Sequence, residues 1–211
     1  MRMIDLETWP RRDHFETFSK MDFPHFSLTV TVELTSFYRY LKQRGVSFTI
    51  GMMYLAAKTA NQIPEFRYRI RGESVVEHEV IHPSSTILTD DNLFTFCSVR
   101  YAEDFQDFAT RAATKIAAAK STPNLDDSNW EDTLLFMTSL PWISFTSMHH
   151  PNISASDSVP RIAWGKYSKE AGKINMPLNV QAHHGLIDGW HVGQFFNQFQ
   201  AYLDEPEKAL L

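Results

Sequence analysis

The sequence concentrates its chemically capable side chains in one short run near its C-terminal end. His183 and His184 are adjacent, Asp188 follows, and His191 lies close behind. A neutral imidazole can accept a proton from a hydroxyl group near pH 7, and a carboxylate can orient such a base or pair with a cation. The run is therefore a candidate site for general base catalysis.

The same histidines could instead bind a metal ion, and a second pair stands at His149 and His150. Protein metal sites need ligands that converge on one point, often at four-residue spacing on a helix. Adjacent residues of a strand point to opposite faces of the sheet, so His183 and His184 would diverge. We therefore expect no metal.

A purely structural explanation is also open for these residues. His184 could be a buried core histidine held by its own backbone, and Asp188 could merely cap a helix that begins near Gly189, since aspartate is a favoured N-cap residue. A thiol nucleophile would have to be Cys97, the sole cysteine, which has no evident base partner in the sequence. We expect Cys97 to be an ordinary strand residue.

The elements that flank the histidine run must position it. Residues 176–182 alternate as a strand does, with Leu178, Val180 and Ala182 on one face and Asn179, Gln181 and His183 on the other. Apolar residues then recur at helical spacing over 192–203. If the pleat continues one residue past the strand, the His184 side chain points to the apolar face, where its ring nitrogens would need hydrogen-bond partners.

The rest of the chain predicts interleaved strands and helices. Alternation predicts a strand over 26–34, and apolar spacing predicts helices over 35–44, 51–63 and 103–120. Further strands are expected within 74–99 and over 134–138, 142–148, 161–168 and 173–182, with a polar loop over 124–132. Because prolines and glycines are scattered and no repeat is visible, we expect one domain over 1–211.

Composition excludes several classes of protein. The 211 residues carry 20 Lys and Arg against 25 Asp and Glu, so the chain lacks the basic surplus that nucleic-acid binding needs. No run approaches the roughly 18 consecutive apolar residues of a membrane-spanning helix. The acidic start does not resemble a signal peptide, and a single cysteine cannot form an internal disulfide, so we expect a cytoplasmic protein.

Other short motifs accompany the histidine run over nearly the whole chain. They are W-P-R-R-D-H-F at 9–15, P-E-F-R at 64–67, H-P at 82–83, P-W-I-S-F-T-S at 141–147, G-K-Y at 165–167 and M-P-L at 176–178. H-H-G-L-I-D-G at 183–189 matches a His-His-x-x-x-Asp-Gly signature. Together, and in this order, these segments resemble the type A chloramphenicol acetyltransferase family, most weakly between about 103 and 132.

The resemblance implies an α/β (α+β) fold, a mixed β-sheet with packed helices, assembled as a homotrimer whose active sites lie between subunits. It implies acetyl-CoA as co-substrate, no metal, and direct acetyl transfer to a hydroxyl of a small-molecule acceptor. The second histidine of the family's motif is the catalytic base, which is His184 here. The motif aspartate pairs with an arginine after the N-terminal tryptophan, which implies an ion pair between Asp188 and Arg11, with Arg12 as a neighbouring alternative.

Two hydroxyl positions of the family differ in this sequence. The serine that donates to the developing oxyanion corresponds to Thr138, which Ser139 follows, and a threonine that helps hold a water corresponds to Ala163. A hydroxyl therefore survives at the first position and is lost at the second. Some stabilisation of the reaction intermediate is expected to be missing.

Six aromatic residues fall at or near places where the family has ligand walls. For the acceptor these are Phe18, Phe26, Phe94 and Phe96, and for the coenzyme A channel they are Trp142 and Tyr167. Aromatic faces suit both tasks, because they can stack on pantetheine or adenine and wall an apolar pocket. Taken singly, each phenylalanine could instead be plain core, which is the commoner role of this residue.

The sequence thus favours an acetyl-CoA-dependent O-acetyltransferase with chloramphenicol as the leading acceptor, which would inactivate the antibiotic. One alternative is a trimer of the same fold that acts on another hydroxylated small molecule. The other is a binding protein that has lost efficient catalysis, favoured by Thr138 and Ala163 and opposed by the intact His184, Asp188 and Arg11.

Overall fold

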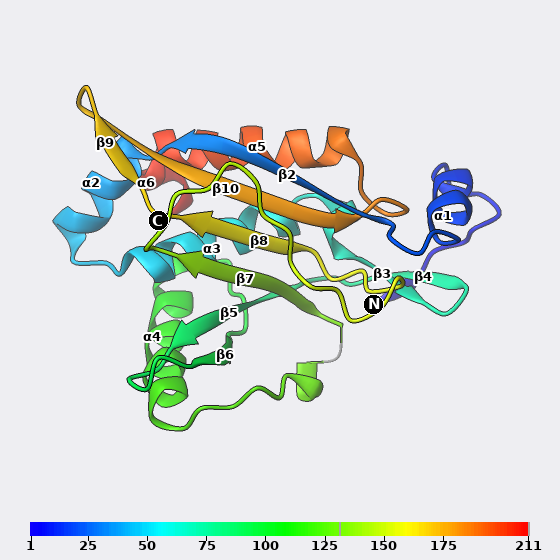
Figure 1. The fold of residues 1–211 in the computed structure, drawn as a ribbon, viewed down its shortest axis with the longest axis horizontal. Coiled ribbons are helices and arrows are strands. Elements are labelled where there is room, and N and C mark those ends of the chain that lie inside the picture. The colour runs from blue at the N-terminus through cyan, green and yellow to red at the C-terminus, as the bar shows by residue number, and fades with distance from the viewer. Residues whose placement is uncertain (131, 211) are drawn as a thin grey trace.

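The computed structural model describes residues 1–130 and 132–210, which fold around a large seven-stranded sheet (Figure 1). Its strands, in spatial order, are β2 (His25–Glu33), β10 (Lys173–His183), β8 (Arg161–Gly165), β7 (Leu134–Leu140), β5 (His82–Leu88) and β6 (Phe94–Ser98), with β9 (Ser168–Glu170) paired to β10. A second sheet consists of β1 (Arg2–Met3), β4 (Ser74–Glu77) and β3 (Tyr68–Arg71). The helices are α1 (Arg12–Phe18), α2 (Thr35–Arg44), α3 (Phe48–Asn61), η1 (Pro64–Arg67), α4 (Phe105–Ser121), η2 (Ser128–Trp130), α5 (Gly189–Asp204) and α6 (Pro206–Ala209).

The large sheet is mixed, as the sequence analysis expected. β7 runs parallel to both of its neighbours, β5 and β8, whereas β2, β10 and β6 pair antiparallel. Parallel neighbours need a crossover between them, and the chain makes these crossovers through α4 and through the long connection 141–160. The expected fold, a mixed sheet with packed helices, is confirmed.

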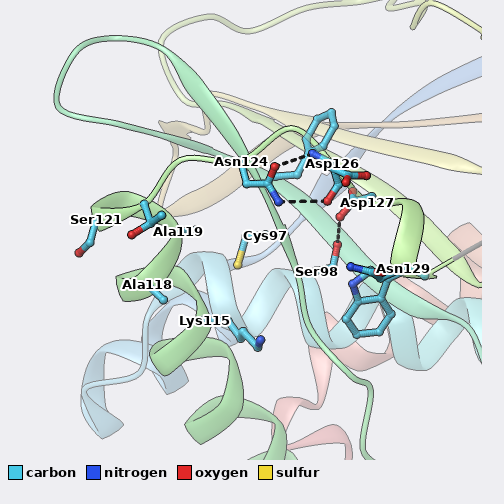
Figure 2. A pocket seen from close by; sticks show the side chains of 13 residues that line it. Cys97, Ser98, Lys115, Ala118, Ala119, Ser121, Asn124, Asp126, Asp127 and Asn129 are labelled. Carbon is cyan, nitrogen blue, oxygen red and sulfur yellow. Dashed lines mark hydrogen bonds between the residues drawn. The ribbon is translucent and has the colours of Figure 1, made fainter.

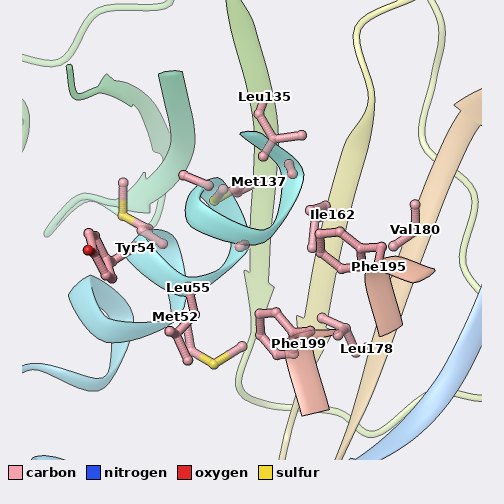
Figure 3. Packing of buried hydrophobic residues seen from close by; sticks show 14 of the residues in the cluster. Met52, Tyr54, Leu55, Leu135, Met137, Ile162, Leu178, Val180, Phe195 and Phe199 are labelled. Carbon is pink, nitrogen blue, oxygen red and sulfur yellow. The ribbon is translucent and has the colours of Figure 1, made fainter. Parts of the chain in front are cut away.

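The apolar core lies between the sheet and two helices that cover one of its faces. Figure 3 shows Met52 and Leu55 of α3 and Phe195 and Phe199 of α5 directed at the strands, where they meet residues such as Leu178. All of these side chains are buried. An α-helix must bury its apolar stripe against another element. The apolar residues that recur every 3–4 positions in α5 therefore pack on the apolar residues that alternate along β10.

Most of the expected elements are present, and one is wrong. The helix predicted over 35–44 is α2 with the same bounds, ended by Gly45, whose φ of +65° suits a residue without a Cβ. Residues 142–148, predicted as a strand, lie outside the sheet. Because β8 runs parallel to β7, the chain must leave the sheet after Leu140 and return to the other end of the sheet, where β8 starts. The alternation within 142–148 therefore marks side chains of a connection, with Trp142 61% exposed.

Both faces of β10 are buried, although they differ in polarity. Leu178 and Val180 meet the helices, while Asn179 and Gln181 point to the opposite face and are also fully buried. The connection 141–160 satisfies Gln181, whose Oε1 accepts from the backbone N–H of His150 at 2.6 Å and whose Nε2 donates to Asn152 Oδ1 at 2.9 Å. The polar side chains of β10 thus fasten an irregular segment to the sheet.

Two buried histidines in this region predict a loss of stability in mild acid. Burial lowers the pKa of His183 and of His150 from 6.5 to about 4. Both rings stay neutral in the folded protein down to that pH, whereas the unfolded chain protonates them below about 6.5, so the unfolded state binds more protons in this window. The free energy of unfolding should therefore fall as pH decreases from 6.5 to 4, and it should not depend on these groups above pH 7.

Urea titrations at pH 7.5, 6.5, 5.5 and 4.5 measure this slope. His150→Asn should make the dependence on pH shallower, and His14→Asn, a change at an exposed histidine, serves as the matched control. A His150→Asn variant whose slope equals that of the control would contradict the assignment of the acid sensitivity to the buried ring.

Candidate functional site

His184 lies just past the end of β10, where the strand pairing with β2 continues for one residue. Its backbone N–H donates to the carbonyl of Pro24 at 2.8 Å. The imidazole stacks on the ring of Phe18, with centroids 4.0 Å apart and planes within 5°, and meets Phe26 at 4.7 Å. These two phenylalanines, expected as acceptor walls, are in direct contact with the candidate base in the same chain.

The ring of His184 is oriented by packing and not by its own backbone. Its Nδ1 is buried, and no hydrogen-bond partner for it exists among the described residues. The structural alternative of a core histidine held by its backbone is therefore not what the geometry shows. Because Nδ1 is the buried nitrogen, Nε2 is the one that a substrate hydroxyl could reach.

His183 has a different environment and is not a second candidate. Its ring is 2% exposed and meets the edge of the His25 ring at 5.2 Å. Its Nδ1 accepts the N–H of Gly185 at 3.1 Å, so the ring helps to form the turn. A Cβ at Gly185 would lie 3.1 Å from the His183 ring, which explains why a glycine fits here.

Asp188 performs two tasks that the sequence analysis treated as alternatives. Its Oδ1 accepts the N–H of Trp190 at 2.9 Å and so caps α5, while its Oδ2 lies 2.6 Å from Arg11 Nη1. Arg11 Nη2 also donates to the carbonyl of His184 at 3.4 Å, so the guanidinium touches both ends of the turn. Arg12 instead pairs with Glu16 on the surface.

The Arg11–Asp188 contact is largely shielded from solvent, with side chains 12% and 27% exposed. Burial alone would raise the pKa of Asp188, but the hydrogen bond from Arg11 and the nearby charges of His191 and Arg11 outweigh it and hold the pKa below its usual value. The carboxylate is therefore charged near neutral pH, and removing either partner would leave an unpaired charge.

Thr138 lies far from His184 within one chain. In the sheet register Thr138 of β7 pairs with Ala163 of β8, and Ala163 pairs with Asn179 of β10. His184 is five residues beyond Asn179, which is about 17 Å along the strand, and two strand spacings add about 10 Å across it. A hydroxyl of Thr138 cannot serve an intermediate at His184 of the same chain. Ser139 points to the opposite face from Thr138.

Phe94 and Phe96 belong to the same remote region. They lie on β6, at the opposite edge of the sheet from β2, and contact each other at 5.9 Å. Phe94 is 53% exposed. The four phenylalanines expected as acceptor walls therefore fall into two groups: Phe18 and Phe26 contact His184, whereas Phe94 and Phe96 lie on β6 at the far edge of the sheet.

A hollow of about 350 Å³ adjoins β6 and is closed by α4 and residues 122–130. Figure 2 shows that Ser98 points to Asp127, while Cys97 points away from this pair toward α4. Asp127 accepts from Ser98 at 2.6 Å and from Ser84 at 2.9 Å. Burial raises the pKa of the Cys97 thiol to about 11, which opposes formation of a thiolate and agrees with Cys97 as an ordinary strand residue.

Tyr167, expected in the coenzyme A channel, belongs to an aromatic cluster whose other members, Tyr38 and Phe48, the sequence did not predict. Its ring meets Tyr38 at 5.4 Å and Phe48 at 6.3 Å, beside a hollow of about 400 Å³ lined in part by Tyr38, Lys42 and Phe48. Lys42 and Lys169 place ammonium groups 5.7 and 5.1 Å from the Tyr38 ring. The available signal was the four-residue spacing of Tyr38 and Lys42 on α2.

No group of three or more His, Cys, Asp and Glu side chains among the described residues could hold a metal ion. No helix in the described part of the chain is long and apolar enough to cross a membrane.

Comparison with known proteins agrees with this geometry. The family model described as chloramphenicol acetyltransferase matches residues 1–200. The chain belongs to the chloramphenicol acetyltransferase family. A relative from a Klebsiella species, named chloramphenicol acetyltransferase, is 30% identical over 206 residues, 96% of this chain and 93% of the relative.

Solved structures extend the comparison. A chloramphenicol acetyltransferase superposes with a TM-score of 0.89 at 29% identity, covering 96% of this chain and 99% of that one. The dihydrolipoamide acetyltransferase of Azotobacter vinelandii gives a TM-score of 0.71 at 18% identity over 94% of this chain and 88% of that one, which shows a shared fold. This member of the chloramphenicol acetyltransferase family is an acyltransferase enzyme.

The two tasks of Asp188 can be separated by one substitution. Asp188→Asn keeps a side-chain oxygen for the N-cap and removes the negative charge that Arg11 needs. We expect the variant to lose about 2–4 kcal/mol of stability, several degrees of melting temperature and most of its activity, because a guanidinium cannot shed its proton. Arg11→Ala should behave alike, and the double variant should lose less than the sum of the two.

Thermal melts and acetyl-transfer rates measure this effect, with Asp104→Asn as the matched control. Asp104 caps α4 by accepting the N–H of Asp107 at 2.8 Å and forms no ion pair with another described residue. Its replacement should have little effect. Strict additivity of the Arg11 and Asp188 changes, or equal losses for Asp104→Asn and Asp188→Asn, would reduce Asp188 to a helix cap.

Proposed function

We propose that this acyltransferase transfers the acetyl group of acetyl-CoA to a hydroxyl of a small-molecule acceptor, with chloramphenicol as the leading acceptor and His184 as the general base. The observation that carries the proposal is the imidazole of His184, stacked between aromatic rings at a turn that a shielded ion pair holds in place. The relatives named for chloramphenicol support the choice of acceptor.

In the proposed reaction, Nε2 of His184 takes the proton of the acceptor hydroxyl while that oxygen attacks the thioester carbonyl carbon. A tetrahedral intermediate forms, and its negative oxygen needs a hydrogen-bond donor, a role we assign to the Thr138 hydroxyl. The carbon–sulfur bond then breaks, and the imidazolium returns the proton to the departing thiolate. The products are an acetyl ester and free coenzyme A, and no acyl-enzyme is required.

The cluster around Tyr167 supports binding of the coenzyme. Coenzyme A combines an adenine ring with several phosphates, and the cluster offers partly buried aromatic rings together with the ammonium groups of Lys42 and Lys169. Aromatic faces can stack on adenine, and lysines are point charges for phosphate. We assign the nucleotide end of acetyl-CoA to this cluster, with Trp142 nearer the pantetheine.

The distance between Thr138 and His184 supports an active site that two chains share. If both residues act on one intermediate, they must come from different copies, because the register separates them within one chain. Exposed apolar side chains on the surface, including Phe23 at 90% and Ile153 at 87% exposure, are suited to contacts between copies. We therefore propose a homotrimer, a single domain per chain over 1–211, with sites between subunits.

The proposed activity is tested by following thiol release from acetyl-CoA with and without chloramphenicol. Release that depends on chloramphenicol, and that falls by several orders of magnitude in His184→Ala but little in His183→Ala, is the expected result, because only His184 presents a nitrogen to substrate. Release that requires a different alcohol would keep the chemistry and replace the acceptor. No release with any alcohol, together with coenzyme A binding, would favour the binding-protein alternative.

A complementation experiment tests the shared site. His184→Ala and Thr138→Val are each expected to be inactive or nearly so as homotrimers, the second by roughly a factor of 10². When the two variants are unfolded, mixed in equal amounts and refolded together, about a quarter of the sites should combine an intact His184 with an intact Thr138 from a neighbouring chain. Measured activity should rise accordingly.

Refolding each variant alone provides the control for that experiment. A mixture with no more activity than the mean of the two controls would place both groups in separate roles or in one chain. Thr138→Ser, which keeps the hydroxyl, should remain active in every format.

A further inference from the structure

One more buried side chain reaches the Asp188 carboxylate and has no role in the chemistry above. His191, in the first turn of α5, is 8% exposed, and its Nδ1 lies 2.9 Å from Asp188 Oδ1. Its Nε2 lies 3.5 Å from Glu65 Oε1, in η1. The imidazole therefore stands between two carboxylates, one of which is the partner of Arg11.

The contacts of His191 complete the set around Asp188. Oδ2 of Asp188 is occupied by Arg11, and Oδ1 is met by the N–H of Trp190 and by Nδ1 of His191. The backbone N–H of Asp188 donates to the same Nδ1 at 3.2 Å, and the two residues form a reciprocal capping box. Because Nδ1 accepts this hydrogen bond, it cannot also donate to Oδ1, and the ring nitrogen free to donate is Nε2, which faces Glu65. Arg11 and the N–H of Trp190 already hold the two carboxylate oxygens, so the contribution of His191 is to hold the backbone of Asp188, from which the carboxylate projects.

Packing alone does not explain an imidazole at this position. A phenyl ring would fill the space without the desolvation that a buried polar ring requires. The structure instead supplies a polar partner on each ring nitrogen, and Glu65 comes from P-E-F-R at 64–67, a separate segment of the chain. A ring held at both nitrogens cannot turn, which is the property that a positioning group needs.

We propose that His191, anchored by Glu65, is a positioning residue of the catalytic turn: by accepting the backbone N–H of Asp188 it fixes this residue, whose carboxylate holds Arg11 and, through the 3.4 Å contact of Arg11 Nη2, the carbonyl of His184. The series Glu65, His191, Asp188, Arg11 thus connects η1 to the base. This inference rests on the proposed role of His184.

Three substitutions at His191 test which ring nitrogen matters. Asparagine places its amide near the position of Nδ1, glutamine places its amide near Nε2, and phenylalanine keeps the ring and removes both nitrogens. His191→Phe and His191→Gln should lower kcat about tenfold, because the turn shifts by a fraction of an ångström, while KM for acetyl-CoA stays within a factor of about two. His191→Asn should retain most of kcat.

Amide hydrogen exchange gives a second readout that does not need activity. The N–H groups of Leu186 and Ile187, both bonded to the carbonyl of His183, report the order of the turn. They should exchange faster in the Phe and Gln variants than in wild type, and the Asn variant should be close to wild type. Gln194→Ala, at an exposed position in the same helix, is the control for a change in α5 itself.

The outcomes separate the inference from the proposed function. If wild type transfers no acetyl group but the exchange pattern distinguishes Asn from Gln and Phe, the positioning role stands and the assignment of His184 as base fails. If the three variants behave alike in exchange and in kcat, or if the loss lies in KM for acetyl-CoA, His191 is not a positioning residue. Melting temperatures identify any variant that fails to fold. The two variants that do fold are then compared in exchange and in kcat to test the positioning role.

Discussion

The arrangement of the candidate site depends on the ion pair between Arg11 and Asp188. These residues are 177 positions apart in the chain, and their contact fastens the segment before α1 to the turn between β10 and α5. The same carboxylate accepts the N–H of Trp190, one of the N–H groups in the first turn of α5 that have no acceptor within the helix. The Asp188 carboxylate therefore holds the N-terminal segment at Arg11 against the turn and caps the first turn of α5. Through Arg11 it also fixes the position of the His184 carbonyl.

Next to this ion pair, the His184 ring is held mainly by packing against aromatic side chains. Phe18, the last residue of α1, and Phe26, near the start of β2, contact the imidazole from two sides. Because α1 begins immediately after Arg11, the ion pair also positions the helix that carries Phe18. The stacking of the ring and the anchoring of the turn are consequences of the same N-terminal segment.

The sheet imposes the second constraint, which is distance. Parallel pairing of β7 with β8 and antiparallel pairing of β8 with β10 separate Thr138 from His184 by the length of several residues and the width of two strands. A chain with this register carries the candidate base, His184, at one place and the Thr138 hydroxyl at another. Assembly of copies is the arrangement that we propose to reunite them, and it gives a physical reason for apolar side chains on the surface.

Much of this was determined by the sequence itself, and the remainder by tertiary contacts. Local periodicity identified β2, α2, α5 and β10, because the apolar residues of each repeat at the period of a strand or of a helix, and the motif at 183–189 pointed to His184, Asp188 and their turn. Local pattern could not show that residues 142–148 leave the sheet, since that follows from the parallel pairing of β7 with β8, which requires a return connection. It also could not show that Asp188 both caps a helix and pairs with Arg11, that Phe18 stacks on His184, or that Glu65 meets His191. These contacts depend on which remote segments the fold brings together. The spacing of residues along the chain does not determine how far apart such segments lie in space.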